Sequence, residues 1–243
     1  MIKWVDSIAS TNTAIAADPS AAHGDVLATV EQTAGPGQRG NSWEAAPGKN
    51  LTFSMVLRPR VIPPAEAFAI SMLTCMSVAD VIAQAMNRHD VLIKWPNDIY
   101  VNNDKICGIL IENSFGSHID RSIIGVGINV NQETFVSDAP NPISMWQLTR
   151  RRYDLNALLE QITARMLADF DRYEAAPDIG TLTTRYRSRQ WRGSGVYSWR
   201  DNLTDEIIDA AIADIAPDGT LTLDTTPPRR YAFKEISPII VKN

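Results

Sequence analysis

The segment VLIKWPNDIYVNNDKICGILIENS, residues 91–114, has the pattern of short strands separated by tight turns. A proline turn around Pro96 and the turn Asn102-Asn103-Asp104 separate three apolar runs, which are 91–94, 99–101 and 106–111. Apolar runs divided by Pro or Asn-rich turns are typical of β-hairpins. The segment therefore predicts antiparallel neighbours within a β-sheet.

Two lysines interrupt the apolar runs of this hairpin. Lys94 follows three apolar residues, so its ammonium needs either solvent or an anionic partner, and Asp98 is a candidate partner. Lys105 stands just before Gly108, where its ammonium could meet an anionic ligand. A solvated side chain is the alternative for each lysine, and the local sequence leaves both interpretations open.

The segments around the hairpin predict a sheet flanked by helices. Ser10 or Thr11 can cap a short helix that follows the first strand, and Gly125 and Gly127 would let a ligand or another backbone approach their strand closely. Alternation and apolar runs predict strands at 2–5, 25–31, 50–57 and 121–131. Helical spacing of apolar residues predicts helices at 13–17, 65–86 and 155–173.

The loop EQTAGPGQRGNSW, residues 31–43, has the composition of a ligand cradle. Its three glycines can expose backbone N–H groups to a phosphate or carboxylate. Arg39 and Gln32 add side-chain donors, and Trp43 adds a flat apolar surface. A Gly-rich surface connection is the alternative when the loop is considered alone.

Composition limits the class of protein. The 243 residues carry a net charge of −5, which argues against nucleic-acid binding through global charge. The two cysteines and three scattered histidines have no metal-ligand spacing. No uninterrupted apolar run approaches the ~18 residues that a membrane span needs. The N-terminus also lacks a signal-peptide pattern, so we expect a cytoplasmic protein without a membrane partner.

The chain changes character near residue 186. Beyond this point short apolar segments alternate with Gly, Asp and Pro, which predicts a small β-barrel. We expect two domains, residues 1–185 and residues 186–243.

Five ordered motifs together resemble biotin protein ligases, and the resemblance spans nearly the whole chain. The motifs are STN at 10–12, EQTAGPGQRGNSW at 31–43, KWPND at 94–98, KICGILIE at 105–112 and GVGINVN at 125–131. The resemblance implies an α+β fold, with a mixed β-sheet flanked by helices in a class II synthetase-like catalytic domain and a small C-terminal SH3-like β-barrel. Some members carry an N-terminal DNA-binding domain. Because this chain begins at the first catalytic strand, the monofunctional type is expected.

The resemblance also implies the reaction. Biotin and ATP would form biotinyl-5′-AMP and pyrophosphate, with Mg²⁺ accompanying ATP. The biotinyl group would then pass to a lysine of a biotin-acceptor domain, such as the biotin carboxyl carrier domain of acetyl-CoA carboxylase. The resemblance allows a homodimer.

The family motifs imply roles for individual residues. Lys105 and Arg39 would be catalytic. Biotin would be bound by Ser10, Thr11, Asn12, Gln32, Gly35, Pro36, Gly37, Gln38, Trp43, Lys105 and Gly108. ATP and the adenylate would be bound by Arg39, Gly40, Trp43, Lys94, Asn97, Asp98, Lys105 and Asn129. No residue is assigned to a protein-held metal, and Lys94 and Asp98 could instead hold the hairpin.

Two departures from the family pattern leave other functions open. The loop has Pro36 and Gln38 where arginines are usual, and Pro36 also lacks a backbone N–H. A catalytically weakened biotin-binding protein is one alternative. A lipoate or octanoate ligase of the same superfamily is the other, and Gln32 and Trp43 disfavour it because a linear acyl chain needs no contacts to a ureido ring.

Overall fold

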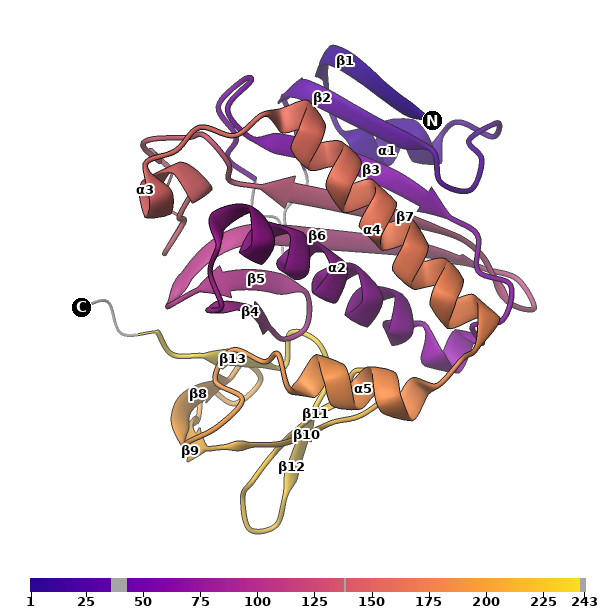
Figure 1. Ribbon diagram of the computed structural model, residues 1–243. Coiled ribbons are helices and arrows are strands. Elements are labelled where there is room, and N and C mark those ends of the chain that lie inside the picture. The colour runs from indigo at the N-terminus through magenta and orange to yellow at the C-terminus, as the bar shows by residue number, and fades with distance from the viewer. Residues whose placement is uncertain (36–42, 138, 241–243) are drawn as a thin grey trace.

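The computed structural model describes residues 1–35, 43–137 and 139–240, and a seven-stranded mixed sheet forms its centre (Figure 1). The spatial order of the strands is β1-β2-β3-β7-β6-β5-β4. Their bounds are β1 Ile2–Ile8, β2 Val26–Gln32, β3 Leu51–Leu57, β4 Val91–Lys94, β5 Asp98–Val101, β6 Asp104–Phe115 and β7 Ile119–Ile128. β1 and β2 are parallel, and the other neighbours are antiparallel. The predicted hairpin is therefore confirmed as β4, β5 and β6.

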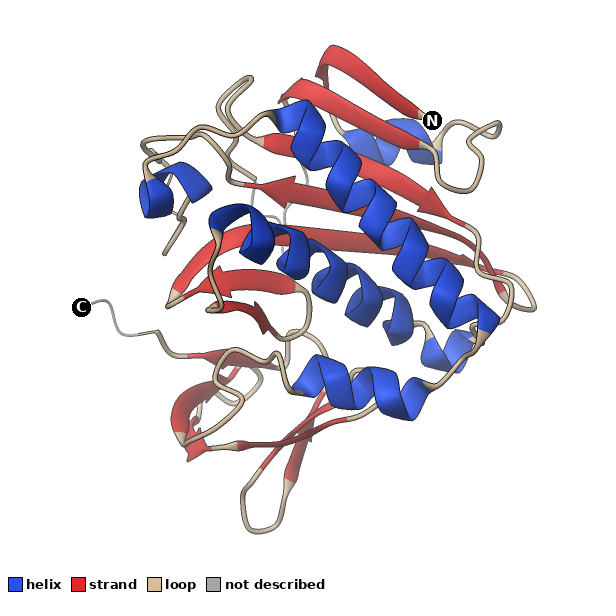
Figure 2. Ribbon diagram, viewed as in Figure 1, coloured by secondary structure: helices blue, strands red, loops and turns tan. Residues whose placement is uncertain are grey.

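Two long helices, α2 (Phe68–Met86) and α4 (Leu155–Ala175), cover one face of the sheet (Figure 2). A 3₁₀ turn, Pro64–Glu66, precedes α2. The segment Pro64–Met86 is long and apolar enough to span a membrane, but 78% of its most apolar window is buried in the protein. Its Ala, Met and Ile side chains pack on the sheet and on α4, which explains this composition without a bilayer.

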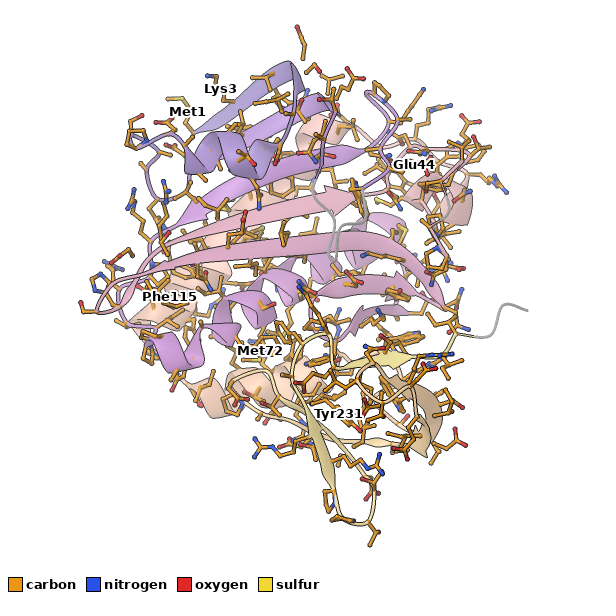
Figure 3. The ribbon with its side chains drawn as sticks, turned by 180° about the vertical axis from the view of Figure 1, so that it is seen from behind. Met1, Lys3, Glu44, Met72, Phe115 and Tyr231 are labelled. Carbon is orange, nitrogen blue, oxygen red and sulfur yellow. The ribbon has the colours of Figure 1, made fainter. Side chains whose placement is uncertain are left out.

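The opposite face of the sheet, the open face, is turned toward the viewer in Figure 3. The short helix α1 (Thr11–Ala16) covers one part of it, where Ile15, Val56 and Ile123 form a small separate apolar cluster. Ser10 caps α1, as predicted, because its side chain accepts a hydrogen bond from the Thr13 N–H. The middle of the open face presents small or polar residues, among them Ser54 and Gly127.

One detail of β2 differs from the prediction. The sequence pattern predicts Val26, Leu27 and Val30 as its buried residues, but Val30 is 42% exposed and Ala28 is fully buried. Pairing with β3 ends at Thr29, so Val30 lies beyond the strand that would cover it.

The C-terminal region contains two three-stranded antiparallel sheets, which confirms the predicted small β structure. One sheet has the order β10-β11-β12 and the other β13-β8-β9. The bounds are β8 Tyr197–Asp201, β9 Ile207–Ala210, β10 Ile212–Ile215, β11 Leu221–Leu223, β12 Arg229–Tyr231 and β13 Ile236–Pro238. The hydrophobic core continues from the large sheet into this region. The domain boundary near residue 186 therefore stays a prediction.

Two helices are absent from the sequence prediction. α3 (Met145–Thr149) is only five residues long and depends on a capping box between Ser144 and Gln147. α5 (Ile179–Arg187) is rich in threonine, which weakens the helical pattern, and the cap at Asp178 and packing against α2 stabilise it.

Candidate functional site

A pocket lies on the open face, where the start of α1, the end of β2 and the strands β6 and β7 meet. It contains about 530 Å³ of space, counting the part that opens to solvent. Eight residues proposed from the sequence line it, namely Ser10, Thr11, Asn12, Gln32, Trp43, Asp98, Lys105 and Gly108. Residues far apart in the chain thus meet because the pocket crosses β3, β7 and β6, with the start of α1 and the end of β2 on one side and the start of β5 on the other.

One end of the pocket is polar. Gln32, the last residue of β2, accepts a hydrogen bond at Oε1 from the Thr11 N–H at 2.9 Å. Because the backbone N–H can only donate, the atom facing it must be the amide oxygen, which turns Gln32 Nε2 away from α1. That nitrogen occupies the space that a Cβ would take on Gly35, so Gly35 makes room for the amide.

The floor of the pocket is made of glycines. A Cβ on Gly127 would lie 2.6 Å from Cε2 of Trp43, and one on Gly108 would lie 3.1 Å from Cζ3 of the same ring. The missing side chains of β6 and β7 therefore let the indole lie close to the sheet. Trp43 Nε1 is buried without a hydrogen-bond partner among the described residues.

The other end of the pocket is ionic. Asp98 Oδ1 lies 2.7 Å from Lys105 Nζ, and Asp98 Oδ2 lies 3.7 Å from Lys94 Nζ. Strand register explains the cluster, because Asp98 is paired with Lys94 on β4 and with Gly108 on β6. Lys105 Nζ also lies 5.7 Å from the centre of the Trp43 ring. An anion entering the pocket would meet an ammonium that Asp98 already holds in place.

The aromatic ring beside this cluster is neutral. Lys94 Nζ lies 5.3 Å from the centre of the Tyr100 ring. Burial, followed by the charge of Asp98, raises the pKa of Tyr100, so its hydroxyl remains protonated at neutral pH. Tyr100 therefore adds no negative charge to the cluster, and it contributes a packing surface for Lys94.

Asn97 and Asn129 hold the backbone next to the pocket. Asn97 is buried, and its Nδ2 donates to the Ile109 carbonyl at 2.7 Å. Asn129 Nδ2 donates to the Ile143 carbonyl at 3.1 Å and to the Lys105 carbonyl at 3.4 Å. Asn129 Oδ1 is buried without a partner among the described residues. Contact of these amides with a nucleotide stays a prediction.

Five predicted ligand residues, Pro36, Gly37, Gln38, Arg39 and Gly40, lie outside the described residues. Within the described ranges, no group of three or more His, Cys, Asp or Glu side chains is placed to hold a metal ion. Asp98 is the one carboxylate among the described lining residues, and Lys105 and Lys94 engage it. The described lining therefore lacks the set of oxygen ligands that a resident divalent ion needs.

Two polar residues that contact the predicted ones are absent from the sequence prediction. Ser54 on β3 is hydrogen-bonded to Thr11 and Asn12, and Glu112 on β6 accepts a hydrogen bond from Asn12. The alternation of residues 50–57 places Ser54 on the face opposite Phe53 and Met55. Glu112 closes the motif at 105–112. Both signals are present in the sequence, but the partner of each residue comes from a distant segment.

Together the fold and pocket define an α+β domain with a pocket that is polar at one end and carries lysine charge at the other, which suits a small molecule with a polar group and an anionic group. The sequence profile of the Biotin/lipoate A/B protein ligase family matches residues 4–129, just over half of the chain. The chain therefore belongs to this family.

Two relatives agree with this assignment. The chain is 33% identical over 152 residues to the bifunctional ligase/repressor BirA of Bacillus subtilis, covering 60% of this chain and 46% of the relative. It is 32% identical over 156 residues to the biotin–acetyl-CoA-carboxylase ligase of Paracoccus denitrificans, covering 60% of this chain and 64% of the relative. The matches thus span about half to two thirds of these relatives.

The fold is similar to that of the biotin protein ligase from Aquifex aeolicus in complex with biotin and ATP, with a TM-score of 0.81. This match covers 98% of both chains at 20% identity, so it supports the arrangement of the whole fold, including the small C-terminal sheets.

Proposed function

We propose that this chain is a biotin protein ligase, which activates biotin with ATP as biotinyl-5′-AMP and transfers the biotinyl group to a lysine of an acceptor domain. The observation that carries the proposal is the two-ended pocket. The Thr11–Gln32 pair lies at one end of a glycine floor, and Lys105 lies at the other. The names of the Bacillus and Paracoccus relatives support the same activity.

The polar end suits the ureido ring of biotin. A cyclic urea offers one carbonyl acceptor and two N–H donors. Gln32 Nε2 and the Ser10 hydroxyl can donate to the carbonyl, and the Thr11 hydroxyl can accept from an N–H. Lipoate has no such donors, so the polar end favours biotin among the substrates of the superfamily.

The ionic end suits the adenylation step. A biotin carboxylate oxygen would form a bond to the α-phosphorus of ATP, and the bond from that phosphorus to the pyrophosphate oxygen would break. Both reactants are anionic, so fixed positive charge is needed where they meet. Lys105 supplies that charge from the pocket wall, and Arg39 is proposed as its partner. Trp43 would cover the bound intermediate.

The second step needs a polypeptide substrate. A lysine amine of the acceptor attacks the biotinyl carbonyl, the amide bond forms, and AMP leaves with the bonding electrons. We propose a biotin carboxyl carrier domain as acceptor, in line with the name of the Paracoccus relative. Mg²⁺ bound to the ATP phosphates would reduce their negative charge. Two free, buried cysteines support a reducing, cytoplasmic location.

Exchange of labelled pyrophosphate into ATP tests the activity directly. The purified chain is assayed with Mg²⁺ and ATP, and with biotin, lipoate or neither. Exchange that requires biotin is the expected result, because adenylation is reversible. Exchange with lipoate but not biotin would assign a lipoate ligase. Calorimetric binding of biotin without any exchange would identify a binding protein that has lost the catalytic step.

A further inference from the structure

A hydrogen-bond chain connects the pocket to an exposed carboxylate on β6. Glu112 Oε2 accepts from Asn12 Nδ2 at 2.8 Å. Asn12 Oδ1 lies 2.5 Å from Ser54 Oγ, and Ser54 Oγ lies 2.7 Å from Thr11 Oγ1. Ser54 is fully buried, and Thr11 and Asn12 are nearly so. The chain thus begins at the surface and ends at a hydroxyl that lines the pocket.

The donor and acceptor chemistry of these groups gives the hydrogen-bond chain one direction. An ionised carboxylate can only accept, so the Asn12 atom that faces Glu112 must be the NH₂ group. The Asn12 oxygen then faces Ser54, whose hydroxyl must donate to it. A hydroxyl has one hydrogen, so Ser54 can only accept from Thr11. The Thr11 hydrogen has two acceptors within reach, Ser54 Oγ at 2.7 Å and Gln32 Oε1 at 3.3 Å, and the shorter contact to Ser54 holds it. Thr11 then presents lone pairs to a ligand.

Two further contacts hold the chain in place. The Asn12 amide lies against Gly125, where a Cβ would collide with Oδ1. The Thr11 N–H is bound to Gln32 Oε1 at 2.9 Å, which fixes the backbone that carries the Thr11 hydroxyl. The direction of the hydrogen bonds is consequently set at Glu112, because the middle of the chain cannot move away.

We infer that Glu112, acting through Asn12 and Ser54, is a positioning residue that makes Thr11 an acceptor and so selects a ligand with an N–H donor at this end of the pocket. This inference rests on the proposed function, in which the ligand is biotin and the donor is an N–H of its ureido ring. Glu112 itself is not among the residues that line the pocket.

Substitutions at position 112 can preserve or reverse the chain. Glu112→Gln retains a carbonyl oxygen that can accept from Asn12, so it keeps the direction. Glu112→Lys offers only donors, so the Asn12 amide must turn over, and Ser54 must accept from it and donate to Thr11. The Thr11 hydrogen then turns toward Gln32 Oε1 and the pocket. Asp120→Lys, at an exposed carboxylate on β7, makes the same charge change without touching the chain.

The test measures the Kd of biotin by calorimetry and the KM of ATP by pyrophosphate exchange, using full-length parent and variants. Glu112→Gln and Asp120→Lys are expected to bind biotin within threefold of the parent. Glu112→Lys is expected to raise the Kd of biotin about tenfold or more, since Thr11 then uses a lone pair to accept from Ser54 and its hydrogen turns toward Gln32 and the ligand. The KM of ATP at saturating biotin should change less than twofold.

Four outcomes would overturn the inference. Glu112→Lys binding biotin as well as Asp120→Lys would show that the chain does not affect the ligand. Equal weakening by Glu112→Gln and Glu112→Lys would show that charge matters and direction does not. A parallel rise in the KM of ATP would indicate general damage to the site. A parent that binds no biotin would remove the proposed function and this inference together.

Ser54→Ala provides a second variant that leaves the surface charge unchanged. It interrupts the chain and frees the Thr11 hydroxyl to rotate, so the Kd of biotin should rise about threefold or more. Thermal unfolding of each variant identifies any that fails to fold. If Ser54→Ala folds and binds biotin like the parent, the chain has no role in ligand selection.

Discussion

Lys105 Nζ and Asp98 Oδ1 lie 2.7 Å apart on neighbouring strands, where the turn between β5 and β6 folds the two residues together. Asp98 is paired with Gly108, so the carboxylate sits beside the glycine floor of the pocket. The lysine is thereby held where a ligand anion would enter, and part of its side chain remains exposed at 29%. Holding the charge in advance reduces the reorganisation needed during reaction.

Replacement of Lys105 by Ala should lower the rate of biotin adenylation by about 10- to 150-fold, because a charge-assisted contact contributes about 1.5 to 3 kcal/mol. Pyrophosphate exchange measures this step. Lys3→Ala removes an equal charge from the exposed edge of β1 and should leave the rate unchanged (Figure 3). Adenylation by Lys105→Ala within twofold of the parent would exclude Lys105 from catalysis.

A side chain at Gly127 should displace Trp43. A Cβ at this position would lie 2.6 Å from the indole, which is too close for any real contact, so the ring must leave the floor. If Trp43 covers the adenylate, Gly127→Ala should raise the KM of ATP by about tenfold, equivalent to about 1.4 kcal/mol. Gly180→Ala on α5 is the matched control, because its Cβ would meet its nearest neighbour at an ordinary 3.5 Å. An unchanged KM in Gly127→Ala would contradict this role of Trp43.

Glu44 anchors the segment that follows Trp43. Its carboxylate accepts hydrogen bonds from the N–H groups of Val136 and Ser137 and from Gln132 Nε2, at 2.9 to 3.0 Å. Burial raises the pKa of Glu44, but these hydrogen bonds outweigh it and leave the pKa below its ordinary value. The charged form is therefore the one that stabilises the fold.

Glu44→Gln should lower the free energy of unfolding by about 1 kcal/mol at pH 7. Because the folded-state pKa is depressed, this stabilisation is present above the unfolded pKa near 4.5 and is lost as the pH falls through the folded pKa. The difference between parent and variant should thus shrink under acidic conditions. Urea unfolding at a series of pH values measures this difference in the free energy of unfolding. A difference that grows as the pH falls would show that the charged form of Glu44 does not stabilise the fold.

The sequence predicted most of this architecture because local signals and strand pairing agree. The turn at Asn102-Asn103-Asp104 determines how β5 meets β6, and thereby brings Asp98 to Lys105. The sequence could not predict the hydrogen-bond chain from Glu112 to Thr11, since 100 residues separate Asn12 from Glu112 and only the sheet order brings them together. Likewise, nothing local to Asn97 indicates that its amide binds the Ile109 carbonyl.

The contact between Tyr186 and the turn before β5 leads to the last prediction. The fully buried Tyr186 donates its hydroxyl to the Pro96 carbonyl at 2.6 Å, and Trp95 Nε1 donates to the Gly219 carbonyl at 2.8 Å. The C-terminal region thus supports the turn that carries Asp98 into the pocket. Removing the Tyr186 hydroxyl leaves the carbonyl of the half-buried Pro96 without this donor.

Tyr186→Phe should lower the free energy of unfolding by about 1 to 3 kcal/mol. Because the turn positions Asp98, kcat/KM for adenylation should also fall, by about threefold or more.

Tyr173→Phe is the matched control, since the Tyr173 hydroxyl is buried without a hydrogen-bond partner among the described residues. Its removal should leave stability unchanged or slightly higher, with unchanged adenylation. Urea unfolding and pyrophosphate exchange separate the two effects: a destabilised Tyr186→Phe with parental kcat/KM would show that the C-terminal contact stabilises the fold without positioning Asp98.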